Sequence, residues 1–509
     1  MKTRIQTPGV PLILLLIAFL CTCLQKKKGS GQEELPNIVL LMGDDHGWDE
    51  VGYNGHPFIQ TPVLDEMAAS GLRFDRFYAA HPTSSPTRGS FLTGRHPNRY
   101  GTFSPGWSLR PEEVTIAHLL KNAGYKTAHF GKWHVGPVKK ESPTSPGAMG
   151  FDEWLSHDNF FEMNPVLSRN GEAPQRFNGE GSEVIIDHAI QFMQESKGRN
   201  KPFLAVVWFG SPHEPYSGLP QDLALYDNLP DSLADREVRL TSNETGEQVY
   251  RSLREVLRER YAEITAMDRA IGKLRTFLRE NNLKENTLVI YCGDNGTSAD
   301  AARTGLTLRA QKGSMYEGGI RVPGVAEWPA VIKGPVSTCG ISATTDILPT
   351  LAEITGQPLP DRPLDGISLV RLFHDPSQQR DKPLYFWQFE PADVFGDNPE
   401  PYIGPELQKG TTPLVKMAAG KFSRDFRNYK YNDISENDFM GDRVAMGDRY
   451  KLVVRERNNK RVELYDIQDD PAEERNLGDM YPEIVKQMQT ELLEWQGSVL
   501  NSLKGNDYK

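Results

Sequence analysis

Short apolar runs that each end in a polar turn recur along this chain, and they constrain its fold more than any other feature. Residues 37–42 have the sequence Asn-Ile-Val-Leu-Leu-Met and lead into Gly43-Asp44-Asp45. Residues 288–292 have the sequence Leu-Val-Ile-Tyr-Cys and lead into Gly293-Asp294-Asn295. A short apolar run bounded by turn residues is typical of a strand that is buried on both faces. We therefore predict buried strands with acidic residues at their carboxyl ends.

Two further short strands are expected, at 126–130, which leads into a turn, and in the apolar run 203–209, and the strands alternate with segments of helical periodicity. We expect a helix over 61–71 that is capped by Thr61 before Pro62, and a longer helix over 251–280. In the longer segment, apolar residues spaced by three and four share one face, namely Ile264, Met267, Ile271, Leu274 and Leu278. Strands that alternate with helices predict an α/β fold with a mostly parallel sheet, which binds ligands at the carboxyl ends of its strands.

With 509 residues the chain is too long for one hydrophobic core, because domains usually divide beyond about 250–300 residues. Periodicity weakens in 376–440, which is rich in Pro, Asp, Asn and Gln. We therefore predict a large domain over 36–375 and a smaller C-terminal domain over 376–509. In the smaller domain we expect antiparallel strands at 450–454 and 462–466, a turn at Asn458-Asn459 and a closing helix over 482–503.

The N-terminus has the features of an export signal. Lys2 and Arg4 precede an apolar run over 12–20, which is shorter than the roughly 20 residues of a membrane-spanning helix. We therefore assign residues 1–30 to a signal peptide and expect a periplasmic or cell-surface protein. Cys23 is a candidate for lipid attachment, which would anchor the protein to a membrane, and simple cleavage nearby is the alternative.

The remaining cysteines and the net charge exclude two classes of protein. Beyond the signal the chain keeps Cys292 and Cys339, so one disulfide is conceivable and a disulfide-rich scaffold is excluded. Acidic residues outnumber basic ones by 68 to 58, which gives a formal net charge of −10. Because nonspecific nucleic-acid binding needs a basic surface, we expect no nucleic-acid partner.

The acidic pairs after the first and last of the four predicted strands have two interpretations. Asp44 with Asp45 and Asp294 with Asn295 could supply the oxygen ligands that Ca²⁺ or Mg²⁺ prefers. Alternatively, acids at strand ends cap the turns or helices that follow. Two such pairs in one parallel-sheet chain favour a metal site.

The segment from His81 to Arg95 carries the most specific pattern. It places Ser84 four positions before Arg88, with a proline between them, and Leu-Thr-Gly-Arg follows at 92–95. By itself it indicates a helix start. The whole segment resembles the signature of the type I sulfatases, in which Cys or Ser, any residue, Pro, a variable position and Arg precede Leu-Thr-Gly-Arg. In that family the first residue is oxidised to formylglycine (3-oxoalanine), and the match places it at Ser84. Thr87 departs from the small residue that is commoner there.

The resemblance extends over most of the chain. Within the family, the chain is similar to bacterial arylsulfatases and to N-acetylgalactosamine-6-sulfatases. The other matching segments are 36–48, Gly131-Lys132-Trp133-His134, Pro212-His213-Glu214-Pro215, Gly293-Asp294-Asn295-Gly296, 312–323, 463–471 and Asn476-Leu477. Ala310 and Gln311 replace glycines that are usual before Lys312. The resemblance implies the alkaline phosphatase-like fold: a large α/β domain with a central, mostly parallel mixed sheet flanked by helices, plus a smaller C-terminal domain with an antiparallel sheet and a helix.

The resemblance also implies a site and a reaction, the hydrolysis of a sulfuric ester. One Ca²⁺, with Mg²⁺ as the alternative, is expected to bind Asp44, Asp45, Ser84, Asp294 and Asn295. A hydrated formylglycine at Ser84 would attack sulfur and later release sulfate by re-forming the aldehyde. We expect Arg88 to hold this group, Lys132 and Lys312 to offset sulfate charge, His213 to protonate the leaving alcohol and His134 to take a proton during release.

Several residues and functions stay open at this point. Structural roles are favoured for His46, His81 and His157, and sugar stacking is the alternative to packing for Trp107, Trp154, Phe160, Phe161 and Trp387. The expected partners are a sulfated carbohydrate substrate and, because Ser84 replaces Cys, a radical-type maturating enzyme. Hydrolysis of phosphate or phosphonate esters and carbohydrate binding without turnover are the rival functions.

Overall fold

The computed structural model describes residues 1, 3, 34–241, 247–299, 301, 308–389, 399–418, 421–431, 434–456 and 460–508. Residues 36–509 form one compact unit. Most of the predicted signal, including Cys23, and the predicted turn at Asn458-Asn459 lie outside the described residues. Among the described residues, none of the helices is both long and apolar enough to cross a membrane.

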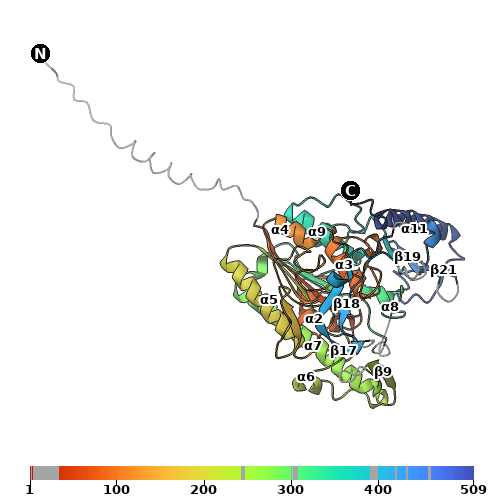
Figure 1. The fold of residues 1–509 in the computed structure, drawn as a ribbon. Helices are drawn as coiled ribbons and strands as arrows, with labels where there is room; N and C mark the ends of the chain where they lie inside the picture. Colours follow the sequence, from red (N-terminus) through yellow and green to blue (C-terminus); the bar gives the residue numbers. More distant parts are fainter. Residues whose placement is uncertain are drawn as a thin grey trace. The chain divides into compact units, whose positions relative to one another are not determined.

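A mixed sheet forms the centre of the larger part of the molecule (Figure 1). In the described part of the chain its ten strands follow the order β14 (Val336–Thr338), β2 (Leu72–Phe74), β13 (Gly324–Glu327), β11 (Thr287–Gly293), β1 (Asn37–Gly43), β8 (Phe203–Trp208), β4 (Lys126–Lys132), β5 (Glu153–His157), β6 (Val166–Arg169) and β7 (Gln175–Arg176). The five strands from β11 to β5 are parallel to one another. The four predicted strands are therefore neighbours, and their carboxyl ends lie at one edge.

Helices cover both faces of this sheet (Figure 1). On one face α2 (Pro62–Ser70), α5 (Gly181–Gly198) and α7 (Leu253–Glu280) share a core with the strands. On the other face α3 (Ser84–Thr93), α4 (Ile116–Asn122) and α9 (Ile347–Thr355) pack together. The five predicted core residues of α7 are all buried, as its periodicity requires. Thr61 occupies the N-cap position before Pro62, as predicted, but its hydroxyl donates to the Asp65 side chain and makes no capping hydrogen bond to the backbone.

A smaller antiparallel sheet follows in the C-terminal part of the chain. It has the order β16 (Leu384–Trp387), β19 (Arg443–Met446), β20 (Tyr450–Arg455) and β21 (Arg461–Asp466), and α11 (Pro482–Leu503) packs on it. The sequence analysis predicted β20, β21 and α11 and missed the strands in its aperiodic segment. Those strands include a separate hairpin of β17 (Lys409–Ala418) and β18 (Lys421–Asp425). The domain boundary at 375/376 stays a prediction.

The remaining strands and α-helices of the described residues are short. They are β9 (Glu237–Thr241) paired with β10 (Gln248–Ser252); β12 (Arg321–Val322), β3 (Phe77–Tyr78) and β15 (Ser342–Ala343) in a small sheet; and the helices α6 (Pro220–Ala224), α8 (Glu317–Ile320) and α10 (Val370–His374). Cys292 is buried and Cys339 exposed, and both are free thiols, so the conceivable disulfide between them is absent from the described residues.

A buried ion cluster joins the smaller sheet to α8. The ammonium of Lys451 on β20 lies 2.9 Å from Glu317 Oε1 on α8 and 2.8 Å from Glu473 Oε1. All three side chains are buried. Burial alone would lower the pKa of Lys451, and the two carboxylates outweigh it and raise that pKa. The cluster therefore couples the smaller sheet to the segment that follows Lys312.

We expect Lys451→Met to lower the free energy of unfolding by about 3–5 kcal/mol, because two buried carboxylates lose their counter-charge. Urea denaturation followed by tryptophan fluorescence measures this change. Lys430→Met is the control, since its pair with Glu400 is exposed and worth less than about 1 kcal/mol. Equal stability of the two variants would contradict the role given to the cluster.

Candidate active site

The predicted site residues converge at the carboxyl edge of the parallel strands. Gly43 of β1 pairs with Gly293 of β11, so the two acidic pairs that follow them lie side by side. Lys132 is the last residue of β4, and His213 follows β8 by a short turn. The parallel register thus brings together groups as far apart in the sequence as Asp44 and Asn295.

The acidic residues of the two pairs form one buried cluster. One carboxylate oxygen from each of Asp44, Asp45 and Asp294 lies within 4.8 Å of the others. The backbone N–H of Asp45 donates to Asp294 Oδ1 at 2.9 Å, and Asn295 Nδ2 donates to Asp45 Oδ1 at 2.9 Å. These two hydrogen bonds join the two acidic pairs to each other. The four side chains are at most 1% exposed.

These residues fit a hard divalent cation. Their donors are all oxygens, the set that Ca²⁺ and Mg²⁺ prefer. Burial and the neighbouring Asp44 carboxylate raise the pKa of Asp294 to about 6. The raised pKa means that the ionised form of Asp294 is unfavourable beside the other carboxylates. A bound cation would stabilise this ionised form, because it offsets the negative charge of the cluster.

Ser84 lies at the start of α3 and touches both acidic pairs. Its hydroxyl is 3.2 Å from Asp44 Oδ1 and 3.3 Å from Asn295 Oδ1, and its side chain is 1% exposed. The adjacent Ser85 points elsewhere, because its hydroxyl donates to the backbone carbonyl of His134 at 2.6 Å. The geometry therefore distinguishes Ser84 from Ser85 in the same way as the sequence pattern does.

Arg88 lies one helical turn beyond Ser84 and on the same face of α3. Its Nη2 is 2.8 Å from Asp294 Oδ2 and 3.4 Å from Asp44 Oδ1, and its Nη1 donates to the Lys132 carbonyl. The side chain is fully buried with its guanidinium over the Trp208 ring at 5.1 Å. A fully buried guanidinium with two carboxylate partners is a fixed positive charge beside the Ser84 hydroxyl.

The two lysines pair with different acids. Lys132 Nζ is 2.6 Å from Asp44 Oδ2, and Lys312 Nζ is 2.6 Å from Asp45 Oδ2. Burial lowers the pKa of Lys132 to about 8 against the pull of Asp44. For Lys312 burial also acts downward, and the nearby carboxylates, Asp45 first, raise its pKa. Both ammonium groups are therefore held close to where an anionic substrate group would meet the cluster.

The two predicted histidines are neutral in this arrangement. Burial lowers the pKa of each well below its ordinary value, and neighbouring cations, Lys132 for His134 and Lys312 for His213, add to the effect. His213 Nδ1 donates to the Glu214 carbonyl at 2.6 Å, its ring stacks on Phe160, and its Nε2 faces Lys312 at 3.5 Å. His134 has a backbone φ of +58°, and no described residue bonds to either ring nitrogen. Such orphaned buried nitrogens are suited to a ligand.

The other candidates have structural partners. The His46 ring bonds to the Glu50 carbonyl and the Tyr291 hydroxyl, His157 bonds to the Pro413 carbonyl and His81 contacts Thr83. The five candidate aromatic residues are at most 7% exposed, which favours packing over sugar stacking. Of them, Phe160 supports the site by stacking on His213 at a centroid distance of 4.3 Å. Sequence reasoning missed this role because no spacing links Phe160 to His213.

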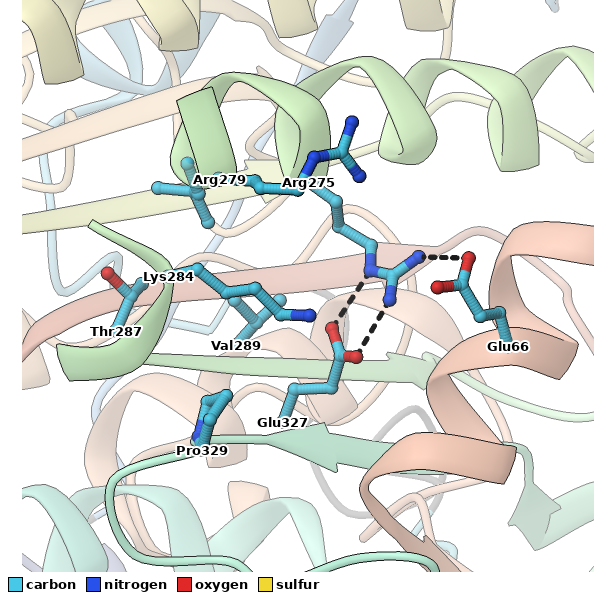
Figure 2. Close-up of a pocket in the computed structure, with 9 residues that line it drawn as sticks. Glu66, Arg275, Arg279, Lys284, Thr287, Val289, Glu327 and Pro329 are labelled. Carbon is cyan, nitrogen blue, oxygen red and sulfur yellow. Dashed lines mark hydrogen bonds and ion pairs between the residues drawn. The ribbon is translucent and has the colours of Figure 1, made fainter. Parts of the chain in front are cut away.

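Figure 2 shows a different pocket, and its charges serve the fold. Arg275 pairs there with Glu327 at 2.8 Å and with Glu66 at 3.0 Å. Thr287, which also lines this pocket, begins β11, whereas Asp294 follows the other end of that strand. Because seven strand residues span roughly 20 Å, this pocket lies at the opposite edge of the sheet from the acidic cluster.

Arg88, Lys132 and Lys312 place three positive charges around the buried Ser84 hydroxyl, an arrangement that suits the hydrolysis of an anionic ester. The site therefore belongs to the class of hydrolases that act on anionic esters. Within that class, the Sulfatase family model matches residues 36–357. The chain belongs to the sulfatase family and is a sulfuric ester hydrolase.

Known relatives agree with this assignment. Human arylsulfatase A is 33% identical over 398 residues, which cover 71% of this chain and 72% of that protein. The ulvan-active sulfatase of Formosa agariphila is 30% identical over 75% of this chain and 74% of its own length. Ps i-CgsB, solved in complex with k-i-k-neocarrahexaose, shares the fold with a TM-score of 0.72 and 22% identity over 93% of this chain and 94% of that chain.

We expect Ca²⁺ binding to the metal-free protein at pH 6 to release a proton from Asp294. With its pKa raised to about 6, Asp294 is partly protonated at this pH and must lose its proton to bind a cation. Calorimetric titration in two buffers of different ionisation enthalpy counts the released protons.

Asp294→Asn should abolish this release and weaken binding by at least about tenfold. Asp231→Asn is the control, because the Asp231 side chain is fully exposed. Equal proton release by Asp294→Asn and the Asp231→Asn control at pH 6 would refute the assignment of the titrating ligand.

Proposed function

We propose that this protein removes sulfate from a sulfated carbohydrate by means of a formylglycine made from Ser84 and one bound Ca²⁺. The position of the Ser84 hydroxyl carries the proposal, since it contacts one residue of each acidic pair at 3.2 and 3.3 Å. Arg88 secures the same cluster from the next turn of α3. A nucleophile derived from Ser84 is therefore placed where a cation and fixed positive charge can favour its ionised form.

In this proposal the cation binds Asp44, Asp45, Asp294, Asn295 and the oxygen of the modified Ser84. When bound, it supplies Lewis-acid polarisation of the sulfate group and favours an ionised nucleophile. The preference for Ca²⁺ over Mg²⁺ rests on the family together with the all-oxygen donor set. The burial of the donors and their mutual hydrogen bonds support one ion.

The remaining residues then have distinct tasks. Arg88 orients the modified Ser84 through its fixed charge, and Lys132 and Lys312 offset the charge of the sulfate oxygens. His213 protonates the leaving alcohol, and the negative charge of a bound sulfate raises its pKa toward the protonated form. His134 accepts a proton from the modified Ser84 when sulfate is released, for which its unpartnered ring nitrogens suit it.

The substrate class follows from the relatives. One relative is named for activity on ulvan, and a neighbouring structure holds a neocarrahexaose. The sulfate would enter a largely buried site in which the three positively charged side chains are balanced by three carboxylates. The sugar would lie toward the surface. We also propose export to the periplasm or cell surface, maturation by a radical-type enzyme, and either lipid attachment at Cys23 or simple cleavage of the signal.

We expect protein produced with a serine-type maturating enzyme to contain a tryptic peptide 77–88 that is lighter by two hydrogens. Fragmentation should place the change at Ser84 and not at Ser85. This protein should hydrolyse 4-nitrophenyl sulfate or a sulfated sugar, and Ser84→Ala should lower kcat/KM by at least about 10³-fold.

Ser85→Ala serves as the neighbouring control and should keep the modification and most of the activity. Full activity with an unmodified Ser84 would overturn the proposal. A faster reaction with matched phosphate or phosphonate esters than with the sulfate ester would instead support the rival hydrolase function.

A further inference from the structure

The β17–β18 hairpin is fixed to the strand end that leads into the candidate active site. Asp158, directly after β5, accepts hydrogen bonds from the backbone N–H groups of Thr411 and Thr412 at 2.6 and 2.8 Å and from the Thr412 hydroxyl. The preceding residue of β5, His157, pairs in register with Lys132. The hairpin is therefore held next to a lysine of the active site.

Arg424 on β18 brings a guanidinium to this side of the site. Its Nη1 lies 3.0 Å from the point that a Cβ on Gly106 would occupy, so the guanidinium packs against the backbone of Gly106. The Gly106 N–H donates to the Ser85 hydroxyl, which in turn donates to the His134 carbonyl. The charge of Arg424 also helps to lower the pKa of His134. One layer of contacts thus separates Arg424 from Ser84 and His134.

Arg424 differs from the other cations of the site because it has no acidic partner in the part of the chain that the structure describes. Arg88, Lys132 and Lys312 pair with Asp294, Asp44 and Asp45. No acidic side chain among the described residues forms an ion pair with Arg424, which is partly buried. A partly buried cation without a counter-charge is unfavourable in the free protein, and an anion from outside relieves this cost.

A second uncompensated polar group follows the same anchor. Asn159, next to Asp158, is 1% exposed, and neither its side-chain nitrogen nor its oxygen has a hydrogen-bond partner among the described residues. Buried polar atoms in folded proteins nearly always have partners. Two such groups beside one hairpin indicate that this side of the site receives a polar ligand.

We infer that Arg424 binds a second anionic group of the substrate, a carboxylate or a further sulfate near the sulfate that is cleaved. This inference rests on the proposed function, because it assumes that the scissile sulfate occupies the cluster around Ser84. It assigns the substrate to carbohydrates that carry at least two negative groups. Arg424 is a specificity-determining residue in this scheme, and it takes no part in bond cleavage.

Binding to Ser84→Ala protein with Ca²⁺ tests the inference without turnover. Calorimetry compares D-glucosamine-2-N,6-O-disulfate with N-acetyl-D-glucosamine 6-sulfate, whose amide nitrogen is uncharged, and a chondroitin 6-sulfate disaccharide with its uronate methyl ester. The first pair tests a second sulfate and the second pair a carboxylate. In at least one pair the dianionic probe should bind at least about tenfold more tightly, the range expected of a charge-assisted bond to Arg.

Arg424→Gln in the same protein should reduce that preference to less than about threefold and leave binding of the monoanionic probe nearly unchanged. Arg427→Gln is the matched control, since it removes the same charge three residues away, where the guanidinium lies over the Trp107 ring at 4.4 Å. This control should keep the preference.

Three results would overturn the inference: no preference in either pair, an equal loss for both members of a pair in Arg424→Gln, or the same loss in Arg427→Gln. Failure of the proposed function would be seen separately, as an absence of turnover by protein whose Ser84 is shown to be oxidised.

Discussion

The burial of three carboxylates at one edge of a parallel sheet is the constraint on which the rest of the active site depends. Asp44, Asp45 and Asp294 lie too close together and too far from water to be ionised without compensation. Arg88, Lys132 and Lys312 each pair with a different one of them. The same cations that make the cluster stable are therefore the ones that meet an anionic substrate.

The ends of the parallel strands hold the carboxylate cluster in place, because their register is fixed by the sheet. The segments that surround the cluster, α8 and the β17–β18 hairpin, come from distant parts of the chain. The segment with Lys312 continues into α8, which Lys451 ties to the smaller sheet through Glu317. The β17–β18 hairpin is attached differently, through hydrogen bonds from its backbone to Asp158. The charge centre thus belongs to the sheet, and the side of the site that we link to specificity belongs to a polar hairpin.

The sequence could predict those parts of the structure that depend on local patterns. Continuous apolar runs predicted β1, β8 and β11, a short segment that leads into a turn predicted β4, and the motif around Ser84 predicted the start of α3, as the structure confirms. The hairpin that holds Arg424 was missed, because its strands have no regular apolar pattern and one of them is bound by Asp158, more than 250 positions away. The unusual state of Arg424 was also invisible, since a missing ion pair is a property of the folded surroundings and of no local pattern.

The deep burial of Ser84 has a consequence for how active protein comes into existence. In the folded chain its side chain is 1% exposed and enclosed by both acidic pairs, so a second enzyme cannot reach it. An oxidation at Ser84 must therefore be complete before α3 packs against the sheet. A molecule that folds first keeps its serine for the rest of its life. Under the proposed function, the relative rates of modification and folding then set the fraction of active molecules, and this fraction is fixed once the chain has folded.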